Sequence, residues 1–267
     1  MGEVITFTSG KGGVGKTTTT ANVGAGLSLL DKKVVLVDTD IGLRNLDVVM
    51  GLENRILYNL VDVLSGKCRL KQALIRDKRY PGLWVIPSPC SNECKERFNQ
   101  KQMTSLLEDL RNEFDYVLID SPAGIDDGFR LATLDADRIV VVTTPQIAAI
   151  HDADCVLQLL KREKMGNVQL LVNCFCKRMV KEGNMLDIPD ICELLEAELL
   201  GVVAQDEEVI IGQNQGRPVT GTRAAAAVGY QNIARRLIGE EIPVSDDIRR
   251  GKLFSKVLWK NTAGKTV

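Results

Sequence analysis

Histidine, aromatic side chains and long apolar runs are scarce in this sequence of 267 residues. It contains one histidine, His151, and only 4% aromatic residues, and no run of eighteen apolar residues predicts a membrane-spanning helix. Seven cysteines are an odd number and no secretory signal is recognisable, so we expect free thiols in a reducing compartment rather than a disulfide framework. Disulfide-stabilised and membrane-spanning proteins are therefore both disfavoured.

Two close cysteine pairs, Cys90 with Cys94 and Cys174 with Cys176, invite a metal-binding interpretation. Neither pair has a second matching pair or a neighbouring histidine, which the spacing of zinc sites requires. We therefore expect no metal at these thiols, and we predict that Cys174 or Cys176 packs as a small hydrophobic side chain. His151 has no evident partner and is predicted to be structural or exposed.

The sequence also lacks a Pro/Ser-rich linker and an internal repeat, so it predicts one folded domain. Short apolar runs alternate with helix-like stretches, and 45% of the residues are hydrophobic, which suits an aliphatic core. This alternation predicts an α/β fold with a mainly parallel sheet and helices on both faces. The predicted strands are residues 4–8, 34–37, 83–86, 116–119, 139–143, 169–172 and 201–203, and a helix is predicted over 17–30.

The most informative segment runs from Gly10 to Thr18 and reads G-K-G-G-V-G-K-T-T. It fits the phosphate-binding template G-x-x-x-x-G-K-[ST] and lies between a predicted strand and a predicted helix, which makes a chance glycine-rich turn a poor alternative. Glycines let backbone N–H groups turn toward a polyphosphate, and the helix directs its positive end at the same anion. Lys16 is expected at the β- and γ-phosphates and Thr17 at Mg²⁺. The predicted nucleotide-binding residues here are Gly10, Lys11, Gly12, Gly13, Val14, Gly15, Lys16, Thr17 and Thr18.

Two aspartate-containing segments follow predicted strands. The first switch segment, residues 38–47, reads D-T-D-I-G-L-R-N-L-D, and the second, residues 120–126, reads D-S-P-A-G-I-D. An apolar strand that ends in Asp120 is typical of a Mg²⁺-binding carboxylate of the Walker B kind. Asp40 is predicted to position the attacking water, and Asp38 to support the metal. The alternative is that these aspartates simply cap the following helices.

Lys11 is not required by the phosphate-binding template. The strand, the sequence K-G-G-V-G-K-T-T and the helix together resemble the deviant Walker A ATPases of the MinD/ParA family, a P-loop NTPase group that includes the nitrogenase iron protein. The resemblance implies a homodimer in which Lys11 reaches the partner's ATP, where a cation stabilises the transferred phosphoryl group. It also implies Mg²⁺-dependent hydrolysis of ATP to ADP and phosphate, with Lys11, Lys16 and Asp40 as catalytic residues. The alternative is a solvated loop lysine.

The two switch segments resemble those of the MinD branch of this family, and the similarity extends over essentially the whole chain. It includes T-T-P at 143–145 and Asn173 at the end of a predicted strand. The resemblance implies that Asn173 recognises adenine and that the protein positions the division site. One departure is visible at 202–205, which reads V-V-A-Q where the family usually has a proline. Alanine at Ala204 frees a backbone that proline would fix.

Positive charge is concentrated at the end of the chain. The net charge is −1, but residues 249–267 contain six basic and no acidic residues, which leaves 28 basic and 35 acidic residues in 1–248. Within 251–260 the apolar residues share one helical face and the lysines the other, with Trp259 near the boundary. This pattern predicts a short amphipathic helix that lies in an anionic membrane surface. Its predicted membrane-binding residues are Lys252, Leu253, Phe254, Lys256, Val257, Leu258 and Trp259.

The sequence thus predicts an ATPase domain over 1–248, a membrane-targeting helix over 249–260 and a polar tail over 261–267. The alternative for the helix is docking on its own domain. The resemblance implies a MinE-like activator, a MinC-like inhibitor and a cytoplasmic or plastid-stromal protein, peripheral on the inner face of the membrane.

Three other functions compete with this interpretation. A flagellar-placement ATPase would share the tail. A ParA-like partitioning ATPase would need a basic DNA-binding surface, whereas this body is acidic, so we expect no nucleic-acid partner. An iron–sulfur protein would need a cysteine soon after the 116–120 strand, and none is present there.

Overall fold

The structure is a computed structural model that describes residues 1–89 and 100–247. The predictions made for Cys90 and Cys94, for the membrane-targeting segment 249–260 and for the tail 261–267 lie outside these residues. No helix in the described part of the chain is both long enough and apolar enough to span a bilayer.

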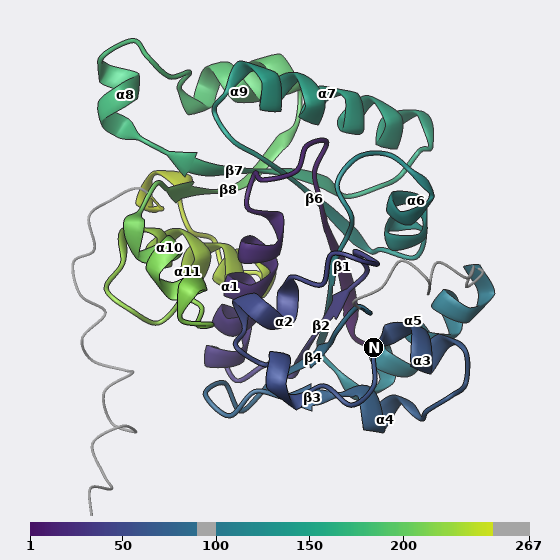
Figure 1. Ribbon diagram of the computed structural model, residues 1–267. Coiled ribbons are helices and arrows are strands. Elements are labelled where there is room, and N and C mark those ends of the chain that lie inside the picture. The colour runs from purple at the N-terminus through teal and green to yellow at the C-terminus, as the bar shows by residue number, and fades with distance from the viewer. Residues whose placement is uncertain (90–99, 248–267) are drawn as a thin grey trace, which may run out of the picture.

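An eight-stranded sheet forms the centre of the fold, with the strand order β3-β4-β2-β5-β1-β6-β7-β8 (Figure 1). All neighbouring strands are parallel except β3, which pairs antiparallel with β4 at one edge. The predicted α/β fold with a mainly parallel sheet is therefore confirmed. The strands are β1 (Glu3–Thr8), β2 (Val34–Asp38), β3 (Ile75–Arg76), β4 (Leu83–Ile86), β5 (Tyr116–Asp120), β6 (Arg138–Thr143), β7 (Val168–Phe175) and β8 (Glu198–Ala204).

Helices cover both faces of this sheet (Figure 1). The predicted helix over 17–30 is present as α1 (Lys16–Leu29), which packs with α11 (Ala225–Leu237) on one face. The other helices are α2 (Leu46–Val49), α3 (Leu60–Leu64), α4 (Leu70–Ala73), α5 (Gln100–Glu113), α6 (Asp127–Thr133), α7 (Ile147–Arg162), α8 (Lys177–Lys181), α9 (Ile188–Leu195) and α10 (Glu207–Asn214), with short 3₁₀ turns η1 (Glu53–Arg55) and η3 (Val244–Asp246).

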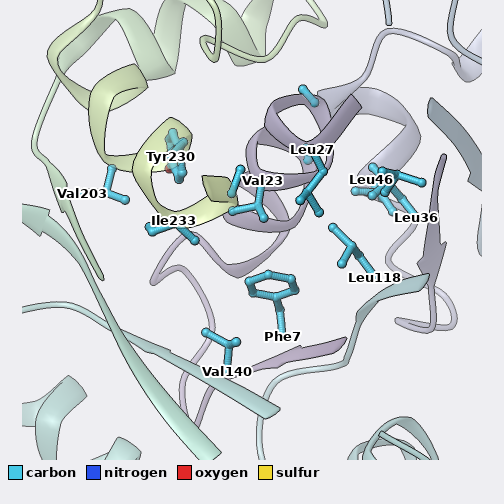
Figure 2. Packing of buried hydrophobic residues seen from close by; sticks show 14 of the residues in the cluster. Phe7, Val23, Leu27, Leu36, Leu46, Leu118, Val140, Val203, Tyr230 and Ile233 are labelled. Atoms are coloured by element: carbon cyan, nitrogen blue, oxygen red, sulfur yellow. The ribbon is translucent and has the colours of Figure 1, made fainter. Parts of the chain in front are cut away.

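Successive side chains along a strand point to opposite faces of the sheet, so each strand contributes to the hydrophobic clusters on both faces. Leu36 packs in the cluster that contains α1 and α11, whereas Val35 and Val37 pack with α3 and α5. Figure 2 shows the first cluster, in which Phe7 lies against α1 and Tyr230 and Ile233 come from α11. Full burial of each such side chain contributes about 1.5–3 kcal/mol, which explains why the strands read as near-continuous apolar runs.

Parallel pairing brings the ends of many strands to one edge of the sheet. The loops after β1, β2, β5, β6 and β7 all leave from the carboxyl ends of neighbouring strands. In open α/β sheets this edge is where ligands bind. The phosphate loop and both switch segments lie on it, so segments far apart in the sequence meet there.

Candidate nucleotide-binding site

The phosphate loop joins β1 to α1 in a conformation that only glycine adopts easily. Gly13 and Gly15 have φ values of +81° and +88°, in the left-handed region. A Cβ on Gly15 would lie 2.2 Å from Nδ2 of Asn173, and one on Gly10 would lie 2.2 Å from the carbonyl oxygen of Asp152 on α7. The two ends of the loop are thus packed closely against α7 and the end of β7, with no room for a larger residue at Gly10 or Gly15.

Lys16, the first residue of α1, reaches the end of a neighbouring strand. Its Nζ lies 2.9 Å from Oδ1 of Asp120, the last residue of β5, and both side chains are buried. The hydroxyl of Thr20, one turn further along α1, also donates to that oxygen at 3.4 Å. The structure therefore brings together the lysine and the Walker B aspartate that the sequence predicted for one site.

Asp38 lies beside Asp120, because β2 and β5 pair in parallel with these two residues in register. Its Oδ1 accepts the N–H of Asp40 at 3.0 Å, and its Oδ2 accepts the N–H groups of Asn45 at 3.3 Å and Leu46 at 3.2 Å. Burial, and next the charge of Asp120, raise the pKa of Asp38 to about 7. Asp38 thus holds the backbone of the first switch segment, and its contribution to a metal site stays a prediction.

The carboxyl group of Asp40 lies near the same cluster of charges. Burial raises its pKa, the ammonium of Lys16 opposes the rise and the carboxylate of Asp120 adds to it. The backbone is held as well, since Ser88 donates its hydroxyl to the carbonyl of Asp40 at 3.0 Å. Asp40 is half-buried, and its role in positioning the attacking water stays a prediction.

Lys11 is exposed on the phosphate loop. The loop beneath it is fixed, because Ser9 donates its hydroxyl to the carbonyl of Lys11 at 3.0 Å and Gly124 donates its N–H to the carbonyl of Ser9 at 2.9 Å. Gly124 belongs to the second switch segment. The contact between that segment and the loop holds the exposed side chain of Lys11 next to the phosphate-binding residues, and its role toward a partner subunit stays a prediction.

The residues present fit Mg²⁺. Oδ2 of Asp120 is buried and makes no hydrogen bond to any described residue, so one carboxylate oxygen is available for a cation. Among residues 1–89 and 100–247, no group of three or more His, Cys, Asp or Glu side chains could hold a metal alone. Mg²⁺ commonly takes one or two protein oxygens and completes its shell with phosphate oxygens and waters. Thr17 adjoins Lys16 at the start of α1, and its hydroxyl as a second ligand stays a prediction.

Asn173 is buried near the end of β7, and its Nδ2 donates to the carbonyl of Val14 at 2.9 Å. This contact between the amide and the phosphate loop was not predicted, and recognition of adenine stays a prediction. A cavity of about 540 Å³ adjoins the same strand end. Its lining comes from the loop after β6, from the β7–α9 connection and from Gln205, and consists of Thr144, Pro145, Gln146, Ile147, Cys174, Met179, Gly183, Asn184, Met185, Leu186 and Gln205.

The cysteine and histidine predictions had mixed outcomes. Cys174 is exposed at a bulge of β7, with φ +56°, and Cys176 is half-buried, its N–H directed at the sulfur of Met185 at 3.3 Å. The fully packed side chain is Phe175, between them. The thiols are therefore not the small core residues that were expected. His151 is exposed on α7, as predicted.

Several polar contacts of the site have no local signal in the sequence. Gln213 of α10 donates its side-chain amide to the hydroxyl of Thr18, the last residue of the phosphate-binding segment. One turn along α1, Oδ1 of Asn22 accepts the N–H groups of Val219 at 2.8 Å and Thr220 at 3.0 Å. The partners are almost 200 residues apart along the chain, and only the fold reveals that they fix α1 to the α10–α11 region.

A glycine loop between the central strand of a parallel sheet and a helix, with its lysine buried against the next strand's aspartate, is the arrangement of a P-loop nucleotide-binding protein. A family profile described as an AAA domain matches residues 2–171. The septum site-determining protein MinD of Bacillus subtilis is 49% identical over 246 residues, which cover 91% of this chain and 92% of that relative. The chain belongs to the MinD family of septum site-determining proteins.

Solved structures agree with this assignment. The chain is similar to MinD in the MinC:MinD cell division complex of Aquifex aeolicus, with 42% identity and a TM-score of 0.83 over 90% of this chain and 97% of that one. It is also similar to MinD complexed with Mg-ADP from Pyrococcus horikoshii, with 25% identity and a TM-score of 0.80 over 90% and 97% of the two chains. The family resemblance read from the motifs is thereby confirmed.

Proposed function

We propose that this chain is an ATPase that dimerises on ATP, binds an anionic membrane reversibly and places the division site by recruiting a MinC-like inhibitor. The observation that carries the proposal is the buried contact of Lys16 with Asp120, in a chain of the MinD family. The Mg-ADP complex of the Pyrococcus relative supports Mg²⁺ and an adenine nucleotide as ligands. The MinC:MinD complex supports the inhibitor partner over the flagellar-placement and DNA-partitioning alternatives.

In this proposal the chain's own residues bind, orient and shield the triphosphate. Lys16 and the loop N–H groups take the β- and γ-phosphates, and Thr17 and Asp120 hold Mg²⁺, which neutralises phosphate charge when bound. Asp40 orients the water whose oxygen forms the new bond to the γ-phosphorus as the bond to ADP breaks. The partner subunit's Lys11 stabilises the charge that develops on the transferred group. Asn173 contacts adenine.

Membrane attachment is assigned to residues 249–260. A single short amphipathic helix binds weakly, whereas two helices carried by one dimer gain avidity. ATP-dependent dimerisation therefore couples the nucleotide state to location, and hydrolysis releases the protein, which a MinE-like activator would accelerate. We propose no nucleic-acid partner, because acidic residues outnumber basic ones in the body of the chain.

Co-sedimentation with anionic vesicles tests this assignment. With ATP the full chain should sediment with the vesicles, and with ADP or no nucleotide it should remain largely in solution. Truncation after Ile248 should abolish ATP-dependent sedimentation while nucleotide binding is preserved, because it removes the whole amphipathic segment. Phe254→Glu should do nearly as much, since it loses an aromatic side chain worth ~1.5–3 kcal/mol of transfer energy.

The matched control is truncation after Lys260, which removes only the polar tail and should sediment as the full chain does. Each lysine contributes about 1 kcal/mol of attraction to anionic lipid, so binding should weaken with salt and on neutral vesicles. Sedimentation of the chain truncated after Ile248 at the level of the full chain would overturn the membrane assignment.

A further inference from the structure

Helix α2, which begins within the first switch segment, packs against α10 through bare backbone. Gly51, just beyond α2, touches Gly216, just beyond α10: a Cβ on Gly51 would lie 2.7 Å from the carbonyl oxygen of Gly216, and one on Gly216 would lie 2.5 Å from Cα of Gly51. Both glycines have φ +61°, in the left-handed region. The two helix ends therefore meet more closely than any side chain would permit.

One arginine joins the same two helix ends. Arg79, in the turn between β3 and β4, donates Nη1 to the carbonyl of Gly216 at 2.7 Å and Nη2 to the carbonyl of Met50 at 2.5 Å. Met50 directly follows α2. Because a guanidinium is planar and rigid, the two bonds fix the spacing between the end of α2 and the end of α10.

The guanidinium is itself held by a buried carboxylate. Asp77 is 1% exposed, and its Oδ2 lies 2.6 Å from Nη2 of Arg79 while its Oδ1 accepts Nε at 3.2 Å. Oδ1 also accepts the backbone N–H groups of Arg79 at 2.6 Å and Tyr80 at 3.3 Å. Such charge-assisted, two-point contacts set orientation as well as energy. Asp77 and Arg79 together are called the clamp.

Both helices that the clamp joins, α2 and α10, are hydrogen-bonded to residues of the phosphate site. The N–H group of Leu46, the first residue of α2, binds Asp38, so the position of α2 determines the path of the segment that carries Asp40. On the other side, Gln213 of α10 binds Thr18 at the start of α1. The switch segment and the phosphate loop are thus tied to opposite sides of one α2–α10 contact.

We propose that Arg79, oriented by Asp77, is a positioning residue for ATP hydrolysis, which holds α2 against α10 and so keeps Asp40 in place at the phosphate site. This inference rests on the proposed function, because it assigns Asp40 to the attacking water. Nothing in it requires Arg79 to touch the nucleotide. A displaced Asp40 would slow the chemical step and leave ATP binding intact.

The test is Arg79→Lys in the full chain. Lysine retains the charge beside Asp77, but its single nitrogen cannot reproduce the guanidinium fork. We expect kcat to fall about tenfold while KM and the affinity for a fluorescent ATP analogue change by less than about twofold, since misplacement of a catalytic group acts on the chemical step. Hydrogen exchange of a peptide covering residues 39–50 should become faster.

Arg76→Lys is the matched control. Arg76 lies on the same β3–β4 hairpin and donates Nε and Nη2 to the carbonyl of Pro81 at 3.2 and 3.1 Å, but these bonds do not reach α2 or α10. This variant should keep the wild-type kcat and exchange. Gly216→Ala is a second, independent variant, because its Cβ forces the helix ends apart with the clamp residues intact. It should reproduce the Arg79→Lys result.

Unchanged kcat and unchanged exchange over 39–50 in both Arg79→Lys and Gly216→Ala would overturn the inference. A lower melting temperature with wild-type kcat would also overturn it, because that result assigns the clamp to stability alone. If the wild-type chain itself hydrolyses no ATP, the proposed function fails. Even in that case, the hydrogen-exchange measurement still reports whether the clamp holds the first switch segment.

Discussion

At the scale of single residues, the carboxyl group of Asp120 lies between two different partners. Lys16 approaches it from the phosphate loop and Asp38 from the neighbouring strand. The ammonium of Lys16 compensates the charge of Asp120. Burial and the neighbouring charge of Asp120 disfavour the charged form of Asp38, so the pKa of Asp38 rises to about 7. Three backbone N–H groups of the switch segment oppose that rise. The geometry of the switch backbone is thus linked to the charges of the phosphate site.

Lys16→Ala and Asp40→Ala should separate binding from hydrolysis. Removal of Lys16 deletes the phosphate contact and leaves Asp120 buried without its cation, so ATP binding should be lost. Asp40→Ala should bind ATP and lose at least about a hundredfold in turnover, because it removes the group that positions water. Fluorescent-nucleotide titration and phosphate release measure the two effects. Wild-type turnover by Asp40→Ala would remove that residue from the mechanism.

The residues of the phosphate site could be predicted because each belongs to a short motif next to a recognisable strand. Lys16, Asp38 and Asp120 are all found together where strand order places them. The clamp could not be predicted, since Arg79 binds backbone carbonyls that come from 29 and 137 positions away. A carbonyl has no side-chain identity, so no sequence pattern marks such a partner.

At the scale of elements, the last described residue joins three parts of the fold. Asp247 is fully buried, and its carboxylate accepts the N–H of Val202 on β8 at 2.9 Å, Nδ2 of Asn232 at 3.0 Å and the guanidinium of Arg236 at 2.8 Å. Both of these side chains come from α11. Burial raises the pKa of Asp247 above its usual value, and its hydrogen bonds oppose only part of that rise. The end of η3 is thereby fixed to the edge strand and its covering helix.

Asp247→Ala should lower the free energy of unfolding by about 3 kcal/mol, because it removes the buried carboxylate paired with Arg236 and leaves the N–H of Val202 without its acceptor. Glu240→Ala is the control: Glu240 accepts Nε of Arg235 at 2.8 Å at the partly exposed end of the same helix, and its loss should cost less than about 1 kcal/mol. Urea denaturation of both variants measures the difference. Equal stabilities would show that Asp247 is not a structural anchor.

The strands themselves were well predicted, because burial on both faces demands apolar runs. Some details were not. β7 continues to Phe175 beyond the predicted end at 172, through a bulge at which Cys174 has positive φ, and local hydrophobicity carries no sign of such a bulge. β3 has only two residues and pairs antiparallel at the edge, too short for any periodicity to reveal.

At the scale of the whole molecule, Lys11→Ala tests the dimer. In an Asp40→Ala background, which should accumulate the ATP-bound state, addition of ATP should convert the chain from monomer to dimer in sedimentation velocity. Lys11→Ala in that background should stay monomeric, because it lacks the cation that reaches the partner's phosphates. Lys71→Ala, at an exposed lysine of α4, should dimerise normally. Dimerisation of the Lys11 variant at the control level would refute the contact in trans.

The anchored end of η3 also has a mechanical consequence. Asp247 is fixed to β8 and α11, and the first predicted membrane-binding residue is Lys252, so in the proposed membrane-bound state the four residues 248–251 would connect the body to the bilayer. Four residues span at most about 14 Å. A connection of this length would keep the domain close to the lipid. In the proposed membrane-bound state, the face that bears η3 would therefore lie near the membrane. In the proposed dimer the two folded domains would limit the distance between the two attachment points, and with it the area of membrane over which both segments can bind at once.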